Sequence, residues 1–390
     1  MSRNIAPPHE SVHAAAAVLK HWLTAQALPL WASAGFDAIA GRFEERLAFD
    51  GRRLVEAPIR LLVQARQVHV YALASQRNWS SEALALVERA FASMVRDYCG
   101  KGGREGWAYS IARDGTAIDS TRDLYAHAFV LLAVASYVSA TGERAALEIA
   151  EEATAFLDRN MKAPNGEGYV EVLPGKSGSR RQNPHMHLFE AMLALWECTG
   201  NTVYLQRADR LYDLFVRRFF RAEPGVVIEY FDDDLRPAPG DIGRIVEPGH
   251  QYEWCWLLRR YERACGVDKA GHLIEVLYRH AERHGHDVEG FPVDEVLLDG
   301  SKKASSRRLW PMTEAIRCNL VEGLRGRPLC LERAAALSML LFDRFLKPAA
   351  AGTWIDRLDA EGQAVSDFAP ASSLYHLVGA IDELQNVASN

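Results

Sequence analysis

The segment that decides the fold runs from His187 to Gly200 and reads HLFEAMLALWECTG. Its apolar residues recur at the three- and four-residue spacing of a helix, and glycine is a residue type that commonly ends helices. A more amphipathic helical pattern follows over Val203–Phe220. Together the two patterns predict a helical hairpin with one apolar and one amphipathic member.

The same unit recurs along the chain. The other helices predicted from this periodicity are Ser80–Cys99, Tyr125–Thr141, Arg144–Met161, Tyr252–Cys265 and Ala270–His284. Glycines at positions 142, 200 and 266 follow the apolar members, so the stops are separated by similar lengths of chain. Alternating strand patterns are short and few, and the best are Gly168–Leu173 and Gly225–Tyr230. The chain is therefore expected to be all-α, with small β-hairpins in its loops.

One polar residue near the start of each apolar helix marks the repeat. The marked residues are Arg66, His127, His187, His250, Glu314 and His376. Successive members of this series are 61, 60, 63, 64 and 62 positions apart, so six units nearly fill the 390 residues. Six hairpins that close on themselves form an (α/α)6 barrel, a toroid with an inner and an outer ring of helices. We expect a single domain over residues 1–390, with the apolar helices inside because only the outer ring meets water.

The toroid has a consequence for function. If all inner helices begin on one side of the ring, the six marked residues converge on one mouth. A mostly apolar concave surface with a few convergent polar groups is the usual form of a small-molecule site. The loops Ala163–Ser179 and Arg236–Gly249 are expected at the same mouth.

Composition and charge narrow the range of partners. Apolar residues make up 48% and charged residues 25%, which is ordinary for a globular protein. The net charge of -6, without a basic cluster, argues against nucleic acid. The longest early apolar stretch, Ala14–Leu19, is too short for an export signal or a membrane span, so we expect a cytoplasmic protein without membrane contact. The six cysteines are scattered without a CxxC pair, which disfavours zinc sites and disulfide frameworks.

Three segments hold most of the candidate chemistry. They read QNPHMHLFEA from Gln182, EPGHQYEW from Glu247 and RLWPMTEA from Arg308. In the first two, a histidine precedes a glutamate by three positions: His187 with Glu190, and His250 with Glu253. Such pairs share one face of a helix, and a carboxylate beside an imidazole sets its tautomer and raises its basicity, as a general base requires. The alternative is a hydrogen bond that only satisfies a buried histidine.

Other chemistries fit these segments less well. A metal site of histidines and glutamates is one alternative, but no two of the candidate histidines His187, His250 and His376 lie four residues apart around a glutamate. No aspartate-rich ligand cluster occurs either, so no metal is expected. Glu190, Glu253 and Glu314 would supply the carboxylates of a glycosidase, although hydrolases rarely need the accompanying imidazoles. A noncatalytic sugar-binding toroid is a third hypothesis. Arg66, inside an apolar helical pattern, needs a partner, either a carboxylate such as Glu190 or Glu253 or a ligand.

The motifs resemble those of the N-acylglucosamine 2-epimerase superfamily. The resemblance rests on the three segments above, on QAR at residues 64–66 with a following HVY, and on DLYAHAF at residues 123–129. It runs from about Arg42 to His376. Members of this family are (α/α)6 barrels that interconvert sugars at C1 and C2. The resemblance therefore implies the same fold as the repeat, and a monosaccharide as the small-molecule substrate.

The resemblance also assigns roles to residues. It makes His250 and His376 the acid/base pair of a metal-independent reaction that uses no cofactor, with Glu253 orienting His250. It gives His187 and Arg66 the task of binding and polarising the sugar oxygens. The remaining residues expected at the site are Glu190 and Glu314, as its polar floor, together with Trp310, Tyr125 and Asn183.

The sequence around Trp310, RLWPMTE, resembles the mannose isomerase branch most. We therefore expect an aldose–ketose isomerase that converts D-mannose to D-fructose, with D-lyxose to D-xylulose as a side reaction, through ring opening and a cis-enediol. The alternatives are a sugar 2-epimerase and an isomerase of a phosphorylated or sulfonated hexose, whose anion Arg180 and Arg181 would meet. The protein is expected to act as a monomer or a homodimer.

Overall fold

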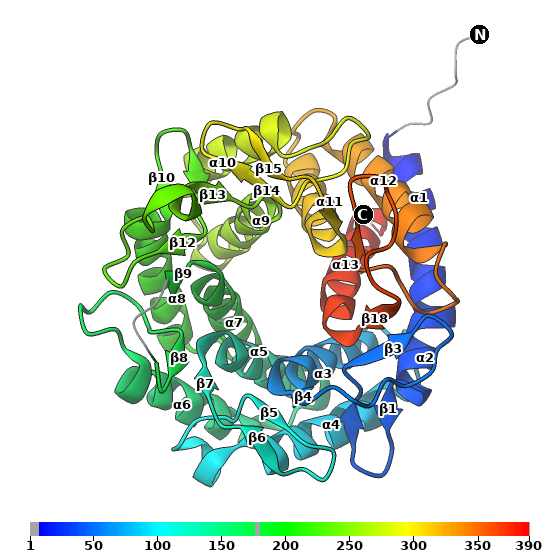
Figure 1. Ribbon diagram of the computed structural model, residues 1–390, viewed down its shortest axis with the longest axis vertical. Helices are drawn as coiled ribbons and strands as arrows, with labels where there is room; N and C mark the ends of the chain where they lie inside the picture. Colours follow the sequence, from blue (N-terminus) through cyan, green and yellow to red (C-terminus); the bar gives the residue numbers. More distant parts are fainter. Residues whose placement is uncertain (1–7, 176–179, 390) are drawn as a thin grey trace.

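The computed structural model describes residues 8–175 and 180–389, which form two concentric rings of helices (Figure 1). The inner helices are α3 (Leu61–Gln76), α5 (Leu124–Thr141), α7 (Asn183–Thr199), α9 (Pro248–Cys265), α11 (Leu309–Leu324) and α13 (Leu374–Ala388). The outer helices are α1 (Pro8–Trp22) with α2 (Leu28–Ser33), α4 (Ala83–Tyr98), α6 (Leu147–Phe156), α8 (Thr202–Leu214), α10 (Gly271–His284) and α12 (Cys330–Leu341). The end of the predicted loop 163–179 lies outside the described residues.

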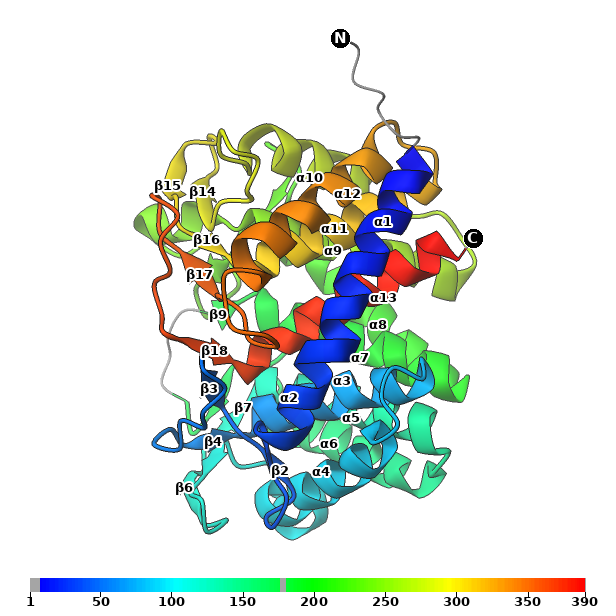
Figure 2. The ribbon, with the colours of Figure 1, turned by 90° about the vertical axis from the view of Figure 1, so that its right-hand side faces the viewer.

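The inner ring closes on itself. Each inner helix contacts the next one along the chain, and α13 returns to contact α3. Helix α1 packs against α12 and α13, so the N-terminal helix fills the outer ring beside the last inner helix (Figure 2). The predicted (α/α)6 barrel is therefore confirmed.

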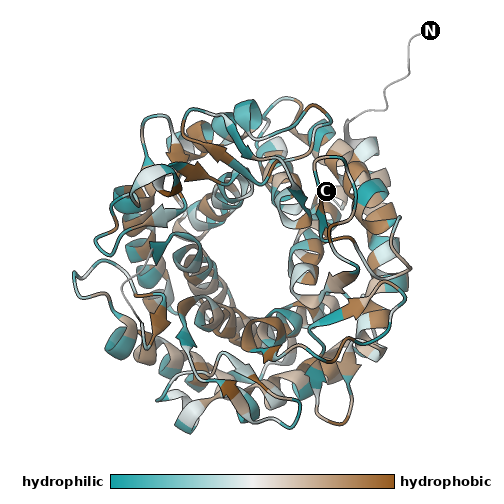
Figure 3. Ribbon diagram, in the orientation of Figure 1, coloured by the Kyte–Doolittle hydropathy of each residue, from teal (hydrophilic) through white to brown (hydrophobic). Residues whose placement is uncertain are grey.

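The two rings differ in what they bury. Most residues of α3, α5 and α7 are buried, and apolar colouring dominates this part of the inner ring (Figure 3). By contrast, α4 and α10 bury one face only. Among the described helices, α5 alone has the length and hydropathy of a membrane span, but it lies between α3 and α7 and 67% of its apolar window is buried inside the protein.

Several outer helices end in a π-helical turn. The predicted helix Arg144–Met161 is a 3-10 turn at Arg144–Ala146, helix α6 and a π turn at Leu157–Met161, and the prediction Val203–Phe220 covers α8 and a π turn at Phe215–Phe219. The other two π turns are Leu23–Ala27, after α1, and Phe342–Leu346, after α12. A π turn adds a single residue to the helical repeat, so the apolar periodicity does not reveal it.

Short strands gather at the end of the ring where the inner helices begin (Figure 2). They are β1 (Phe36–Asp37), β2 (Arg42–Phe43), β3 (Arg46–Ala48), β4 (Ile59–Arg60), β5 (Ser110–Ile111), β6 (Ala117–Asp119), β7 (Arg122–Asp123), β8 (Val172–Leu173), β9 (Arg180–Arg181), β10 (Phe220–Arg221), β11 (Val226–Val227), β12 (Tyr230–Phe231), β13 (Ile245–Val246), β14 (Glu295–Leu297), β15 (Lys302–Ala304), β16 (Arg307–Arg308), β17 (Arg357–Leu358) and β18 (Phe368–Pro370). Short 3-10 helices are Gly100–Gly103, Gly240–Arg244 and Ala371–Ser373. The two predicted strands form only in part, as β8 and as β11 with the start of β12.

These small sheets tie the hairpin units together. Antiparallel pairs join β7 to β8, β9 to β12, β16 to β17 and β18 to β3, and each pair links loops that lie far apart in sequence. The loops therefore form a collar around the mouth of the ring, and the collar adds loop residues to the side chains that the inner helices bring there.

Candidate active site

A pocket of about 370 Å³ opens at the mouth of the ring. Its lining residues are Arg66, Tyr125, Arg181, Asn183, His187, Glu229, Tyr230, Glu247, His250, Glu253, Arg308, Trp310, Asp356, Ser372, Ser373 and His376. Most of the residues expected from the sequence are among them. The other two, Glu190 and Glu314, lie beneath the histidines that they contact. The structure thus brings all ten expected residues together.

The position of each residue in its helix gives its depth in the pocket. Asn183 is the first residue of α7, Trp310 the second of α11, His250 the third of α9, His187 the fifth of α7 and Glu253 the sixth of α9. Because a helix rises about 1.5 Å per residue, the polar groups form layers from rim to floor. Residues of the collar make the rim.

A loop carboxylate holds the imidazole of His250. Nδ1 of His250 lies 2.9 Å from Oε2 of Glu229 and 3.7 Å from Oε2 of Glu247. Burial alone would lower the pKa of His250, but the two negative charges outweigh it and raise that pKa to about 9. His250 is therefore an imidazolium at neutral pH.

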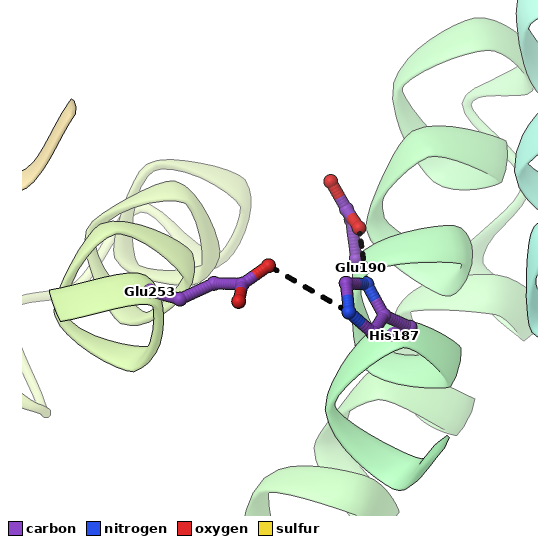
Figure 4. Close-up of side chains that lie close together, drawn as sticks. All are labelled: His187, Glu190 and Glu253. Carbon is purple, nitrogen blue, oxygen red and sulfur yellow. Dashed lines mark hydrogen bonds and ion pairs between the residues drawn. The ribbon is translucent and has the colours of Figure 1, made fainter. Parts of the chain in front are cut away.

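The predicted contact between Glu253 and His250 is wrong. Glu253 lies one helical turn deeper and points across the ring toward His187, with 3.7 Å between Oε1 and Nε2 (Figure 4). Glu229, between β11 and β12, takes the expected place. A three-residue spacing puts two side chains on one helix face, but it does not prevent a loop from supplying a closer carboxylate. The available signal was an acidic residue inside the predicted strand Gly225–Tyr230.

His376 has the opposite electrostatic environment. Its Nδ1 hydrogen-bonds with Oε1 of Glu314 at 2.8 Å, and Oε2 of Glu314 accepts a 3.0 Å bond from Nη1 of Arg317. Burial and the positive charges of Arg66 and Arg317 hold the pKa of His376 well below its usual value. His376 is therefore neutral, and because its Nδ1–H donates to Glu314, its Nε2 has a free lone pair.

Trp310 lies against both histidines. Its ring centroid is 4.7 Å from that of His250 and 5.8 Å from that of His376. Gly249 leaves room for the indole, since a Cβ there would lie only 2.5 Å from Cζ3 of Trp310. Gly249 is therefore needed because the indole packs against it, and not because of its backbone conformation.

The predicted pair of His187 and Glu190 is formed. Nδ1 of His187 lies 3.0 Å from Oε2 of Glu190, which also accepts a 2.6 Å hydrogen bond from the Tyr375 hydroxyl. Burial would raise the pKa of Glu190, but the bond to His187 and the nearby positive charges hold it well below its usual value. His187 thus has a fixed ring, with Nε2 turned toward Glu253.

Glu253 is a buried acid without a fixed partner. Neither of its carboxylate oxygens has a hydrogen-bond partner among the described residues. Burial and the charges of Glu314 and Glu190 raise the pKa of Glu253 well above its usual value. Glu253 therefore holds its proton more tightly than an ordinary glutamic acid, and it lies beside Nε2 of His187.

Neutral groups hold Arg66 in the pocket. Its Nη2 donates to the Tyr125 hydroxyl at 2.7 Å and its Nη1 donates to the Ser372 carbonyl at 3.1 Å. Within the described ranges, neither Glu190 nor Glu253 hydrogen-bonds with it. The alternative of a structural carboxylate partner is therefore wrong, and the charge of Arg66 is available to ligand oxygens.

The expected convergence of His127 on the mouth is also wrong. Its Nδ1 lies 2.7 Å from the carbonyl of Asp123, its Nε2 accepts a 3.2 Å bond from the amide of Trp107, and its ring stacks on Phe156. Tyr125 lines the pocket instead. Residues two apart in a helix point to nearly opposite sides, so a repeat marked by residue type selected the wrong side of α5.

The arginines on the rim already have carboxylate partners. Nε of Arg181 lies 2.8 Å from Oε2 of Glu171. Arg308 donates to Oδ1 of Asp294 at 2.9 Å and to Oε2 of Glu247 at 3.0 Å. Each rim cation is thus neutralised before any ligand enters.

Arg180 does not reach the pocket. It is buried and donates through Nη2 to the carbonyls of Glu167 and Tyr169, at 2.7 and 2.9 Å. The predicted anion contact of Arg180 is therefore wrong, and Arg181 alone of that pair lines the pocket. Arg180 instead holds the loops of the collar together.

Among the described residues, three groups of side chains have the geometry to hold a metal ion. They are His187 with Glu190 and Glu253, His250 with Glu229 and Glu247, and His376 with Glu253 and Glu314. In each group the histidine already uses Nδ1 for a carboxylate of the same group. Hydrogen bonding thus accounts for the clustering, and a reaction without metal stays a prediction.

Comparison with known proteins identifies the family. The family described as N-acylglucosamine 2-epimerase (GlcNAc 2-epimerase) matches residues 41–380. The chain belongs to this family. Within the N-acylglucosamine 2-epimerase family it is 38% identical over 388 residues to a mannose-6-phosphate isomerase of Rhizobium meliloti (strain 1021), covering 96% of this chain and 98% of the relative. It is 31% identical to a D-mannose isomerase of Thermobifida fusca, covering 80% of each.

Solved structures of the family have the same fold. A cellobiose 2-epimerase of Spirochaeta thermophila superposes with a TM-score of 0.86 at 24% identity, over 97% of this chain and 98% of the other. A D-mannose isomerase superposes with a TM-score of 0.84 at 19% identity, over 95% and 97%. The family and its named relatives make this chain an isomerase or epimerase that acts on a sugar.

Proposed function

We propose that this enzyme is an aldose–ketose isomerase that interconverts D-mannose and D-fructose. The observation that carries the proposal is the pair of buried histidines beside Trp310, one with a raised pKa and one with a lowered pKa. Two titratable groups with pKa values pushed apart supply an acid and a base at the same pH. Enolisation of a sugar needs both.

His376 acts as the base in this proposal. Its neutral Nε2 removes the proton from C2 of the open-chain aldose, and the same nitrogen returns the proton to C1 to give the ketose. Negative charge develops on the sugar oxygens as the proton leaves. Arg66 donates hydrogen bonds to those oxygens and stabilises the enediolate.

The hydroxyl protons also have to move. As C2 becomes the carbonyl, O2 loses a proton and O1 gains one. The carboxylic acid of Glu253 donates to O1, and the free Nε2 of His187 accepts from O2. The 3.7 Å between Glu253 and His187 then allows the proton to return and restore both groups. When the sugar opens, His250, as an imidazolium, protonates the ring oxygen, and the proton of the anomeric hydroxyl passes to solvent, from which His250 is protonated again.

A sugar 2-epimerase is the second candidate. If protonated His250 returned a proton to C2 from the face opposite His376, the product would be the epimer. Relatives named cellobiose 2-epimerase match at 22% identity, whereas the two isomerases named above match at 38% and 31%. The isomerase is therefore favoured.

The rim favours an unphosphorylated sugar. Arg181 and Arg308 are paired with carboxylates, and Glu229, Glu247 and Asp356 add negative charge to the lining. A phosphate dianion would have to displace these carboxylates. Because one relative is named mannose-6-phosphate isomerase, a phosphorylated sugar is the alternative substrate.

Product analysis with three substrates tests the proposal. Purified enzyme is incubated with D-mannose, D-glucose or D-mannose 6-phosphate, and the products are separated by chromatography. The proposal predicts fructose from mannose, at a higher kcat/KM than for the phosphate ester. Conversion of mannose mainly to glucose would establish the epimerase instead. Turnover of D-mannose 6-phosphate alone would show that the phosphorylated sugar, and not mannose, is the substrate.

A further inference from the structure

Asp356 occupies a fixed place on the rim of the pocket. It precedes β17 in the loop that follows the π turn at Phe342–Leu346. Its carbonyl oxygen accepts a 2.9 Å hydrogen bond from the amide of Leu309, the first residue of α11. Its Oδ1 accepts a hydrogen bond from the hydroxyl of Ser373, just before α13. The starts of two inner helices thus hold Asp356 in one position.

The second carboxylate oxygen of Asp356 is left for a ligand. In the described parts of the chain, Oδ2 has no hydrogen-bond partner, and the half-buried side chain lines the pocket. Burial raises the pKa of Asp356, while the charges of Arg308 and Arg66 favour its ionised form. Both arginines are hydrogen-bonded to other groups. A carboxylate oxygen in this state is a strong acceptor for a hydroxyl.

Asp356 lies above the level of the histidines. The side chain of Asp356 is hydrogen-bonded to Ser373, which lies just before α13. His376 lies three residues further along the chain, inside α13. At 1.5 Å per residue, this difference places Asp356 roughly 4 to 5 Å nearer the rim. A sugar whose C1 and C2 lie beside His376 therefore has its C6 end at the level of Asp356.

The surroundings of Asp356 are suited to a hydroxyl rather than to a phosphate. The rim cation Arg308 is bound by Asp294 and Glu247. In the proposed reaction Arg66 binds the oxygens at C1 and C2. A 6-phosphate would therefore face the charge of Asp356 without an arginine of its own, and unbalanced like charges exclude a competing ligand. Resting on the proposed function, we propose that Asp356 determines specificity by accepting a hydrogen bond from the C6 hydroxyl of D-mannose and by repelling a 6-phosphate.

The variant Asp356→Asn tests this role. The amide keeps the size of the side chain and an acceptor for Ser373, but it removes the negative charge. The test compares kcat/KM for D-mannose, for D-lyxose, which is mannose without C6, and for D-mannose 6-phosphate. We expect a loss of about fivefold to tenfold on mannose, mainly through KM, because a charge-assisted hydrogen bond is lost. The loss on lyxose should be several times smaller, and the value for the phosphate ester should rise.

A matched variant separates recognition from support. Ser373→Ala removes the hydrogen bond that holds Asp356 but keeps the negative charge. It should therefore lower kcat/KM for mannose without raising the value for the phosphate ester. Equal losses on the two sugars in Asp356→Asn, or no loss on mannose, would overturn the inference alone. A wild-type enzyme that prefers the phosphate ester to mannose would overturn the inference together with the proposed substrate.

Discussion

His250 and Glu229 form a buried ion pair, with 2.9 Å between Nδ1 and Oε2, although Glu229 belongs to the collar and not to the helix of His250. Trp310 also lies near His376, whose hydrogen-bond partner Glu314 is shared with Arg317. One pocket therefore holds an imidazolium and a neutral imidazole. The proposed acid–base catalysis depends on this difference between the two histidines.

The variant Glu229→Gln should shift the alkaline limit of activity. His250 is protonated below a pKa of about 9, so wild-type kcat/KM should fall as the pH rises through that value. Removing the carboxylate charge beside the imidazolium lowers its pKa by about one to two units. The alkaline limb of the pH profile of kcat/KM should move to lower pH by the same amount.

The acidic limb provides the control for this shift. It reports protonation of neutral His376, whose pKa is held well below the usual histidine value, and Glu229 does not contact that residue. Glu229→Gln should therefore leave the acidic limb in place. A profile in which both limbs move together, or neither moves, would contradict the assignment of His250 as the acid.

Replacement of His376 should remove the base. In His376→Gln, kcat is expected to fall by about 10² to 10⁴, the range that a general base contributes. His127→Gln is a matched control, because His127 faces Phe156 and not the pocket. It should lower the free energy of unfolding by about 1–3 kcal/mol through unsatisfied buried groups, yet keep kcat. Steady-state kinetics and denaturant unfolding of both variants make the comparison.

A methyl group at residue 249 should disturb the pocket. In Gly249→Ala, the new Cβ would lie 2.5 Å from Trp310, which has to shift against His250 and His376. Overpacking of this kind costs about 1–3 kcal/mol, and we expect at least about a tenfold loss in kcat/KM. Gly271→Ala, where no atom lies within 4 Å of the added Cβ, should leave kcat/KM unchanged. Comparable losses in the two variants would show that Trp310 is not the cause.

Removal of metal ions should not change the rate. The three candidate metal groups are internally hydrogen-bonded through Nδ1 of each histidine. Enzyme dialysed against EDTA should keep its kcat, and added Zn²⁺ or Mn²⁺ should not raise it. Loss of activity that one divalent ion restores would show that a group such as His376 with Glu253 and Glu314 binds metal.

The ring could be predicted from the sequence because its units repeat. Apolar helices with similar spacing, such as the one that ends at Gly200, require partners on both sides, and a closed ring of hairpins provides them. The collar could not be predicted in the same way. Its strands are two or three residues long and pair across distant loops, so β9 and β12 carry no local signal of their pairing.

In the candidate site, too, the residues on helices could be predicted and the residues on loops could not. Side chains on the first turns of inner helices, such as His187 and His376, could be placed from the repeat phase. Glu229 and Asp356 could not, because they come from loops whose positions depend on tertiary contacts. His127 was misplaced because the repeat gives a position along the helix but not which side of it faces the pocket.

The most direct test of the proposed isomerisation is ¹H and ¹³C NMR of EDTA-treated enzyme with D-mannose in D2O. We expect fructose as the first product, formed without added metal, and a fraction of it should carry deuterium at C1, where His376 returns the proton. Glucose as the first product, with deuterium at C2, would contradict the isomerase. No turnover of mannose under these conditions would contradict both the substrate and the catalytic roles proposed for the two histidines.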